Sequence, residues 1–151
     1  MSAPTDPRLR VRQAEPLNAG PELAALCERS FTPNELFFIR SHGNVPAVDP
    51  EAYRLTVGGL VEVPLTLSLA DLRRDFAPVR LAATLECAGN RRSELIAHAP
   101  IPGELPWEED AIGNAAWTGV PLAQVLAAAR SLQAARHAAF TGLDETERHG
   151  S

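Results

Sequence analysis

The sequence contains no lysine, only two cysteines, one methionine and one tyrosine among its 151 residues. Because lysine is absent, every permanently charged side chain that could bind an anion is an arginine, whose planar guanidinium donates paired hydrogen bonds. Cys27 and Cys87 are too few for a disulfide framework and are typical of a reduced compartment. The sequence also lacks a secretion signal and any apolar run near the roughly 18–20 residues of a membrane-spanning helix. We therefore expect a cytoplasmic protein without a membrane partner, with a periplasmic location as the alternative.

The composition fits a globular domain of ordinary size. Hydrophobic residues make up 45% of the chain and charged residues 22%, which excludes a disordered chain. The formal net charge of −5 argues against a nucleic-acid partner, although it leaves room for a local basic pocket.

The order of predicted elements indicates an α+β fold of mixed sheets and short helices. Prolines predict an irregular amino-terminal arm over residues 1–15, with an irregular path as far as Gly20. The length of the chain fits one domain, placed over residues 16–151. Ser68 is predicted to cap a helix, and the strand over 79–85 is expected to be buried. Apolar spacing and turn residues predict helices over 21–30, 69–76 and 121–129, and strands over 36–39, 53–57, 60–67, 79–85 and 138–143.

Cys87 belongs to the densest group of reactive residues in the sequence, directly after a predicted strand. Ala88 and Gly89 follow, and such small residues let the backbone turn tightly and approach a ligand. Arg91 and Arg92 come next, and their charges would favour the thiolate, the form of cysteine that ligates metals and attacks electrophiles. The alternative is a buried structural cysteine near a surface arginine pair. As a metal ligand, a single soft thiolate suits copper, zinc, iron–sulfur or another sulfur-rich metal centre.

Arg40 and His42 form a second candidate site. They alternate with Ile39 and Ser41, so an extended chain places both donor side chains on one face. That face could bind a phosphate or a sulfur oxyanion. The alternative is an exposed polar end of a strand.

The other candidates have ordinary structural interpretations. Trp107 is typical of a core anchor, although its indole N–H can donate to an anion. Asp144 follows Thr-Gly-Leu and fits a turn residue. The acidic run over 108–110 is interpreted as a solvated loop, and Cys27 as a core residue on an apolar helix face.

The segment Leu85-Glu86-Cys87-Ala88-Gly89-Asn90-Arg91-Arg92 resembles the molybdenum-binding loop of the sulfite oxidase family of molybdopterin enzymes. Residues 37–43 resemble the family's pterin-contacting strand, and residues 111–122 and 140–144 resemble the segments that follow the loop. Four blocks in the family's order and approximate spacing, across residues 16–145, are more specific than one short motif. The resemblance implies a partial sulfite-oxidase-type molybdopterin-binding domain.

The resemblance also implies a site built around a molybdenum–molybdopterin cofactor, in which Cys87 matches the thiolate that ligates the metal. The residues that it implies to be catalytic are Arg40, Cys87, Arg92 and Trp107, with the arginines and the tryptophan at an oxyanion pocket. The residues that it implies to contact the cofactor are Phe38, Ile39, Arg40, Ser41, His42, Cys87 and Asp144. Arginine suits a small, doubly charged oxyanion because it stays charged at any working pH.

The activity implied for the intact protein is oxidation of sulfite to sulfate, with the electrons passed to an unidentified acceptor. The alternatives are reduction of a sulfoxide at the same thiolate-bound metal, and a cofactor-free fragment that acts only as an interaction module. In the family the domain continues beyond the matched blocks and a dimer-forming domain follows it. A homodimer is therefore expected only where that carboxy-terminal part is present, and the isolated chain is expected to bind the cofactor poorly or not at all.

Overall fold

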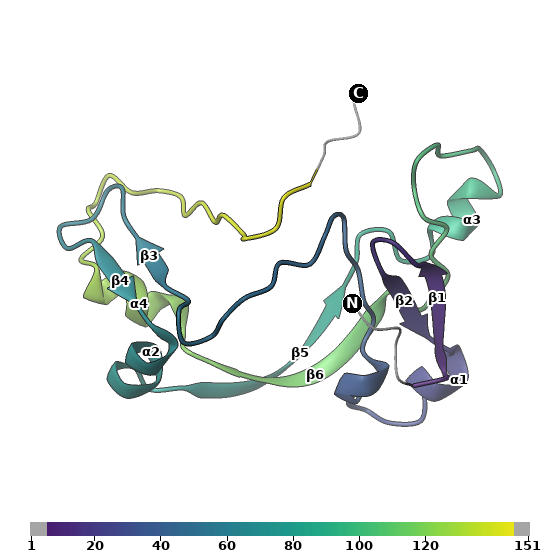
Figure 1. Cartoon of the computed structure of the whole chain (residues 1–151), viewed down its shortest axis with the longest axis horizontal. Coiled ribbons are helices and arrows are strands. Elements are labelled where there is room, and N and C mark those ends of the chain that lie inside the picture. Colours follow the sequence, from purple (N-terminus) through teal and green to yellow (C-terminus); the bar gives the residue numbers. More distant parts are fainter. Residues whose placement is uncertain (1–5, 147–151) are drawn as a thin grey trace. The chain divides into compact units, whose positions relative to one another are not determined.

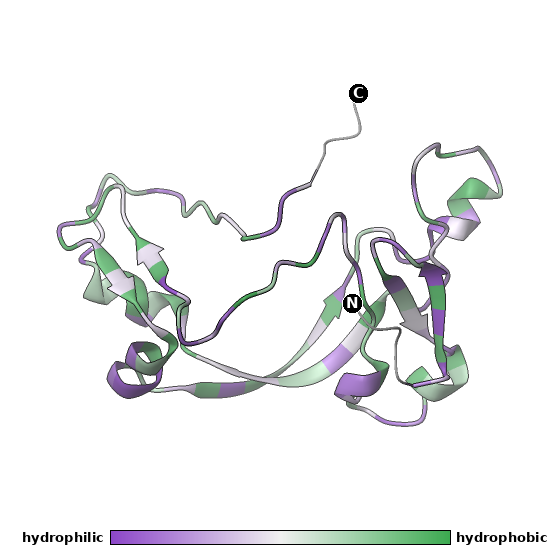
Figure 2. Cartoon of the chain, viewed as in Figure 1, coloured by the Kyte–Doolittle hydropathy of each residue, from purple (hydrophilic) through white to green (hydrophobic). Residues whose placement is uncertain are grey.

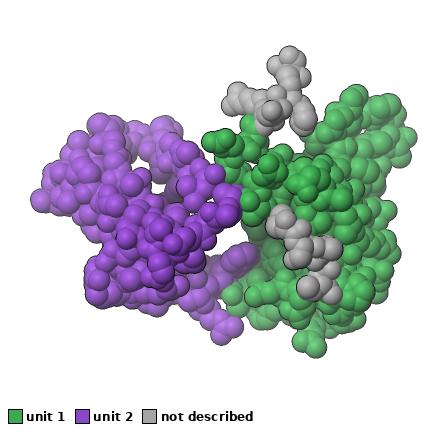
Figure 3. All heavy atoms as spheres, in the orientation of Figure 1, with its two compact units in different colours: residues 1–45, 82–116, 144–151 green, residues 46–81, 117–143 purple. Residues whose placement is uncertain are grey.

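The computed structural model describes residues 6–146, and its contacts divide the chain into two compact units (Figure 3). Unit 1 takes residues 1–45, 82–116 and 144–151, and unit 2 takes residues 46–81 and 117–143. Short helices and small sheets make up the structure, so the predicted α+β class is confirmed. None of the helices described between residues 6 and 146 has the length and apolar character that crossing a membrane demands.

Unit 1 contains a short antiparallel hairpin near the amino terminus. The elements that lie wholly in this unit are β1 (Leu9–Gln13), β2 (Asn18–Pro21), α1 (Leu23–Leu26), the 3-10 turn η1 (Asn34–Leu36) and α3 (Arg92–Ile96) (Figure 1). Leu9 pairs with Pro21, and Gln13 pairs with Asn18. The predicted irregular arm is therefore wrong for β1 and β2, because proline excludes a helix but tolerates strands that alternate polar and apolar residues. The first five residues of that arm lie outside the described part.

The strand predicted over 36–39 is mostly absent. Leu36 is buried at the end of η1, and only Ile39 forms an isolated antiparallel bridge, with Ala19 of β2. The N–H of Ile39 donates to the Ala19 carbonyl at 2.7 Å, and its own carbonyl accepts from the Ala19 N–H at 3.0 Å. One bridge is enough to attach the segment that carries Arg40 to the β1–β2 hairpin.

Unit 2 contains a second hairpin and two helices, each shorter than predicted. These elements are β3 (Leu55–Val57), β4 (Leu65–Leu67), α2 (Leu69–Asp75) and α4 (Leu122–Ala128). Leu55 lies opposite Leu67 in the antiparallel ladder, and Gly59 takes a φ of 86° between the strands. Only glycine adopts such an angle readily, and Gly59 lies in the connection over residues 58–64 that joins the two strands.

The strand predicted over 138–143 is absent. These residues join no ladder, and Phe140 is largely exposed. A short apolar run becomes a strand only when another strand offers its edge at the right place, which sequence periodicity cannot show.

Ser68 caps α2 as predicted. Its hydroxyl accepts from the Asp71 N–H at 3.0 Å, and the Asp71 carboxylate accepts from the Ser68 N–H at 2.9 Å, which completes a capping box. The hydrogen bonds from Ser68, helped by Arg74, lower the pKa of Asp71 from 3.8 to about 2. A carboxylate with a lowered pKa stabilises the folded state above its unfolded pKa and loses that effect as the pH falls.

We expect Ser68→Ala to destabilise the protein by about 1 kcal/mol at neutral pH, the usual cost of a lost N-cap. The difference from wild type should shrink as the pH falls from 3.8 to about 2, because Asp71 is protonated in that range. Urea unfolding at several pH values measures this. Asp75→Asn is the matched control, since the ion pair of Asp75 is made with Arg74 at the surface. A constant difference across the pH range would contradict the prediction.

β5 (Val79–Glu86) and β6 (Ile112–Gly119) pair as a two-stranded sheet, and each strand passes from one unit to the other. The prediction that this segment is buried is wrong, because Val79, Leu81 and Leu85 are exposed, Leu81 by 52%. Hydrophobic positions along these strands are visible in Figure 2. Two strands alone have no second layer over either face, so an apolar sequence does not by itself produce burial.

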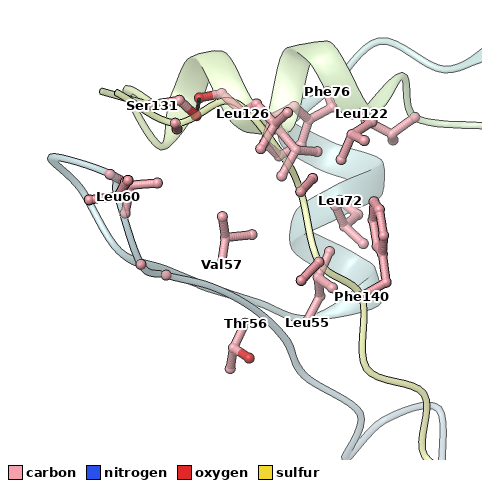
Figure 4. Close-up of a pocket in the computed structure, with 18 of the residues that line it drawn as sticks. Leu55, Thr56, Val57, Leu60, Leu72, Phe76, Leu122, Leu126, Ser131 and Phe140 are labelled. Carbon is pink, nitrogen blue, oxygen red and sulfur yellow. Dashed lines mark hydrogen bonds between the residues drawn. The ribbon is translucent and has the colours of Figure 1, made fainter. Parts of the chain in front are cut away.

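Unit 2 holds an apolar hollow of about 1260 Å³ (Figure 4). Its lining includes Leu55, Val57, Leu72, Leu122, Leu126 and Phe140. None of the residues singled out for chemistry in the sequence lines this hollow, since all of them belong to unit 1. The candidate site therefore lies in unit 1.

Candidate functional site

Cys87 lies directly after β5, at the start of a tight loop. Its N–H donates to the Ala111 carbonyl at 2.9 Å, and its carbonyl accepts from the Asn90 N–H at 2.9 Å. Cys87 is a partly exposed residue, and its Sγ accepts a weak hydrogen bond from the Gly89 N–H at 3.4 Å. A thiol held by the backbone yet accessible, with a loop amide directed at the sulfur, fits a ligand better than it fits a buried structural cysteine.

Asn90 fixes this loop, and sequence reasoning missed its role. Its Oδ1 accepts from the Ala111 N–H at 3.0 Å, and its Nδ2 donates to Glu86 Oε1 at 3.0 Å. Asn90 thus ties the residues before and after the Cys87 loop to one side chain. The signal in the sequence was the Gly-Asn pair, because asparagine side chains commonly hydrogen-bond to the backbone of turns.

The two arginines after the loop behave differently. Arg91 is exposed, has a φ of 61° and pairs with Glu94 at 2.6 Å, so the expectation that both guanidiniums act on the thiol is wrong for Arg91. Arg92 is 17% exposed and donates to the Leu105 carbonyl at 3.0 Å. Its guanidinium packs over Gly89, where an added Cβ would lie 2.5 Å from Nη2. Arg92 therefore remains beside the Cys87 loop, although Glu104 pairs with it at 2.8 Å.

Trp107 is fully buried, as expected of a core anchor. Its carbonyl accepts from the Ser93 N–H at 2.9 Å, which attaches the 98–110 loop to α3. Its indole Nε1 is buried without a hydrogen-bond partner. Because no part of the ring is open to a substrate in this structure, its role in an oxyanion pocket stays a prediction.

A buried ion pair connects β1 to the loop before β6. Arg12 donates to Asp110 Oδ2 from Nε at 3.1 Å and from Nη2 at 2.8 Å, and Nη2 also reaches Glu108 at 2.8 Å. Burial opposes the charge on Arg12, but its hydrogen bonds to Glu108 and Asp110 outweigh that effect and raise its pKa. Hydrogen bonding to Arg12 also lowers the pKa of Glu108. The interpretation of residues 108–110 as a solvated loop is wrong for Asp110, whose side chain is only 5% exposed.

Arg40 and His42 are brought together as predicted. Arg40 Nη2 lies 3.1 Å from His42 Nδ1, and because arginine only donates, Nδ1 is the acceptor. Arg40 Nη1 donates to the Ser41 carbonyl at 2.6 Å and to Asn18 Oδ1 at 3.1 Å. Its Nε is buried without a partner. A buried donor left unpaired is costly, and a polar ligand at this place would satisfy it.

The predicted site residues do not all contact one another. Within residues 6–146, no hydrogen bond or ion pair joins Arg40 to Cys87 or Arg92. Asp144 is exposed, so its contact with a cofactor stays a prediction. Cys27 is exposed at the end of α1, and the interpretation of this residue as core is wrong. The structure thus contains two arrangements in unit 1, one around Cys87 and one around Arg40.

The donor set restricts how a metal could bind at Cys87. In the described part of the chain, no group of three or more histidine, cysteine, aspartate or glutamate side chains could hold a metal ion. A metal ligated by the Cys87 thiolate would therefore take its other ligands from a cofactor.

Comparison with known protein families shows which family the chain belongs to. Residues 42–151 match the family described as the oxidoreductase molybdopterin binding domain. The chain belongs to this family. Membership implies a molybdenum–molybdopterin cofactor, and the residues present fit one, since Cys87 offers an accessible thiol and Arg40 an unpaired buried donor.

Characterised relatives of this molybdopterin-family chain agree with that assignment. The chain is 49% identical over 144 residues to the sulfite oxidase of Gallus gallus, covering 93% of this chain and 31% of the relative. It is 38% identical to the sulfite oxidase of Arabidopsis thaliana, covering 93% and 37%, and 37% identical to the NADPH nitrate reductase of Aspergillus niger, covering 94% and 17%. The chain thus spans well under half of the length of these relatives.

A solved structure supports the same fold. The sulfane dehydrogenase SoxCD from Paracoccus pantotrophus matches with a TM-score of 0.63 and 30% identity, covering 76% of this chain and 28% of that chain. The sulfite-oxidase-like type of molybdopterin-binding fold predicted from the sequence is therefore confirmed.

Proposed function

We propose that the protein carrying this chain oxidises sulfite to sulfate at a molybdenum cofactor bound through Cys87. The observation that carries the proposal is the accessible Cys87 thiol, held in a loop by Ala111 and Asn90, in a chain 49% identical to a sulfite oxidase. In the net reaction, sulfite gains one oxygen atom from water and gives sulfate, two protons and two electrons. The electrons leave to an acceptor of unidentified nature.

The residues of this chain supply binding and orientation. When bound, the cofactor supplies the oxygen-atom transfer and the redox change. Cys87 would hold the metal through its thiolate, with the Gly89 N–H directed at the sulfur. Arg40 and Arg92 would attract the doubly charged anion, because a guanidinium keeps its positive charge throughout. Arg40 is the stronger candidate, because Glu104 already pairs with Arg92.

Reduction of nitrate is a second candidate. The chain is 37% and 38% identical to two NADPH nitrate reductases, and each match covers more than nine tenths of this chain. Nitrate is also a small oxyanion, so the same arginines could bind it.

Assays of the purified, cofactor-containing protein distinguish these functions. We expect sulfite to reduce ferricyanide in a molybdenum-dependent manner, while nitrate and dimethyl sulfoxide fail to oxidise a reduced viologen dye at comparable rates. Turnover of nitrate or of the sulfoxide in place of sulfite would show that this compound, and not sulfite, is the substrate. A molybdenum-loaded protein that turns over none of the three would contradict the proposed function.

A further inference from the structure

We infer that Asn18 is a positioning residue for Arg40, which holds the guanidinium in place with a neutral group so that its charge stays available to an oxyanion. This inference rests on the proposed function, because it takes Arg40 as the residue that binds the anion. No sequence motif pointed to Asn18. The contacts of its fully buried side chain carry the argument.

The carboxamide of Asn18 extends the backbone pairing between β2 and the segment that carries Arg40. The backbone of Ala19 exchanges two hydrogen bonds with Ile39, at 2.7 and 3.0 Å. Beyond this bridge, Asn18 Oδ1 accepts from the Ser41 N–H at 2.9 Å and Nδ2 donates to the Ser41 carbonyl at 3.0 Å. A carboxamide carries the same donor and acceptor as a peptide group, so it takes the place of a strand partner for Ser41, the residue directly after Arg40.

The same oxygen also fixes the guanidinium. Asn18 Oδ1 accepts from Arg40 Nη1 at 3.1 Å, and the Ser41 carbonyl, itself held by Asn18, accepts from that nitrogen at 2.6 Å. These acceptors direct one edge of the guanidinium into the protein. The Nε atom is left buried and unpaired, and Nη2 is directed toward His42.

The neighbours of Arg40 leave its charge uncompensated. Arg12, Arg74, Arg91 and Arg92 all pair with carboxylates. In the part of the chain that the structure describes, no carboxylate forms an ion pair with Arg40, and its protein partners there are neutral oxygens and an imidazole nitrogen. An anion would therefore meet a fixed cation without competition from an internal counter-ion.

An aspartate at position 18 would reverse this arrangement. It would place a carboxylate on Arg40 and compete with the substrate anion, and it would lack the donor that Nδ2 gives to the carbonyls of Ser41 and Pro16. A serine would loosen the contact without adding charge. The two substitutions therefore separate the electrostatic part of the role from the structural part.

The test uses the full cofactor-loaded protein that carries this chain, with inorganic sulfate as the anion probe. Isothermal titration at fixed ionic strength gives the sulfate Kd, steady-state assays give KM and kcat for sulfite, and thermal unfolding reports on the fold. We expect Asn18→Asp to weaken sulfate binding and raise KM on the order of tenfold, with a smaller change in kcat. Asn18→Ser should have a weaker effect, and Arg40→Gln should also weaken sulfate binding. In the Arg40→Gln background, Asn18→Asp should add nothing, because the charge on which it acts is gone.

Gln13→Leu is the matched control. Gln13 Oε1 accepts from Asn18 Nδ2 at 3.4 Å but does not contact Arg40, so sulfate affinity should stay at the wild-type value. If Arg40→Gln weakens sulfate binding but Asn18→Asp and Asn18→Ser lower only the unfolding temperature, the inference is wrong and the proposed function stands. An equal effect of Asn18→Asp with and without Arg40 would also overturn it. If Arg40→Gln leaves sulfate binding unchanged, the anion-binding role of Arg40 fails, and the inference fails with it.

Discussion

Cys87→Ser is expected to abolish sulfite-dependent turnover, with a loss of at least about 100-fold, while the protein still folds. Even the groups that only orient a metal ligand change metal affinity or activity by about 10–100-fold, so loss of the ligand itself should exceed that range. A serine hydroxyl is a harder and far less acidic donor than a thiol and does not replace a soft thiolate. The fold should survive, because among residues 6–146 the one hydrogen bond to Sγ is the 3.4 Å contact from Gly89, which an oxygen can also accept.

Three measurements on the same preparation check this result. These are kcat with sulfite and ferricyanide, bound molybdenum by mass spectrometry, and the unfolding midpoint. Cys27→Ser is the matched control, because Cys27 is an exposed cysteine at the end of α1, and this variant should keep full activity. Full activity in Cys87→Ser would show that Cys87 is not the metal ligand.

Arg12→Met should lower the free energy of unfolding by about 3 kcal/mol, toward the lower end of the range for breaking a buried ion pair. The substitution keeps most of the aliphatic stem but leaves the carboxylate of Asp110 buried without its counter-charge. Asp110 Oδ1 is already buried without a partner, so only Oδ2 is satisfied, and Arg12 is what satisfies it. Arg12 is 16% exposed, which limits how far solvent can replace the lost contact.

Urea unfolding measures this loss, and two further variants interpret it. Arg10→Met is the matched control on the same strand. Arg10 is 55% exposed and lies 3.6 Å from its carboxylate partners, so removing it should cost less than about 1 kcal/mol. Adding Asp110→Asn to Arg12→Met should recover part of the loss, because it removes the stranded charge. Equal costs for Arg12→Met and Arg10→Met would show that the buried pair is not stabilising.

Local signals in the sequence predicted the parts of the fold that depend on neighbouring residues. Ser68 caps α2, because a capping box is complete within a few residues. The predictions failed where an element needs a distant partner. The segment over 138–143 has no strand beside it, and β5 has no layer over its apolar residues. Burial is a property of what packs against a segment, and periodicity reports only the segment itself.

The candidate site divides in the same way. Cys87 and Arg40 could be proposed from the sequence because the blocks that carry the family resemblance include them and their immediate neighbours. The long-range contacts of unit 1 were not predicted, because Asn18 binds Arg40 across 22 positions and Arg12 pairs with Asp110 across 98. The alternating arginines near the amino terminus and the asparagine of the Cys87 loop were visible in the sequence, but nothing local showed which partners they would meet.

The buried contacts of the β1–β2 hairpin also affect where this domain can be cut. The match to the family begins at residue 42, yet Asn18, which binds Arg40, and Arg12, which pairs with the buried Asp110, both precede it. A gene fragment trimmed to the family boundary would lack Arg12 and Asn18 together with Arg40. Its product would be an unsound starting point for reconstituting metal binding, however closely the remaining residues match the family.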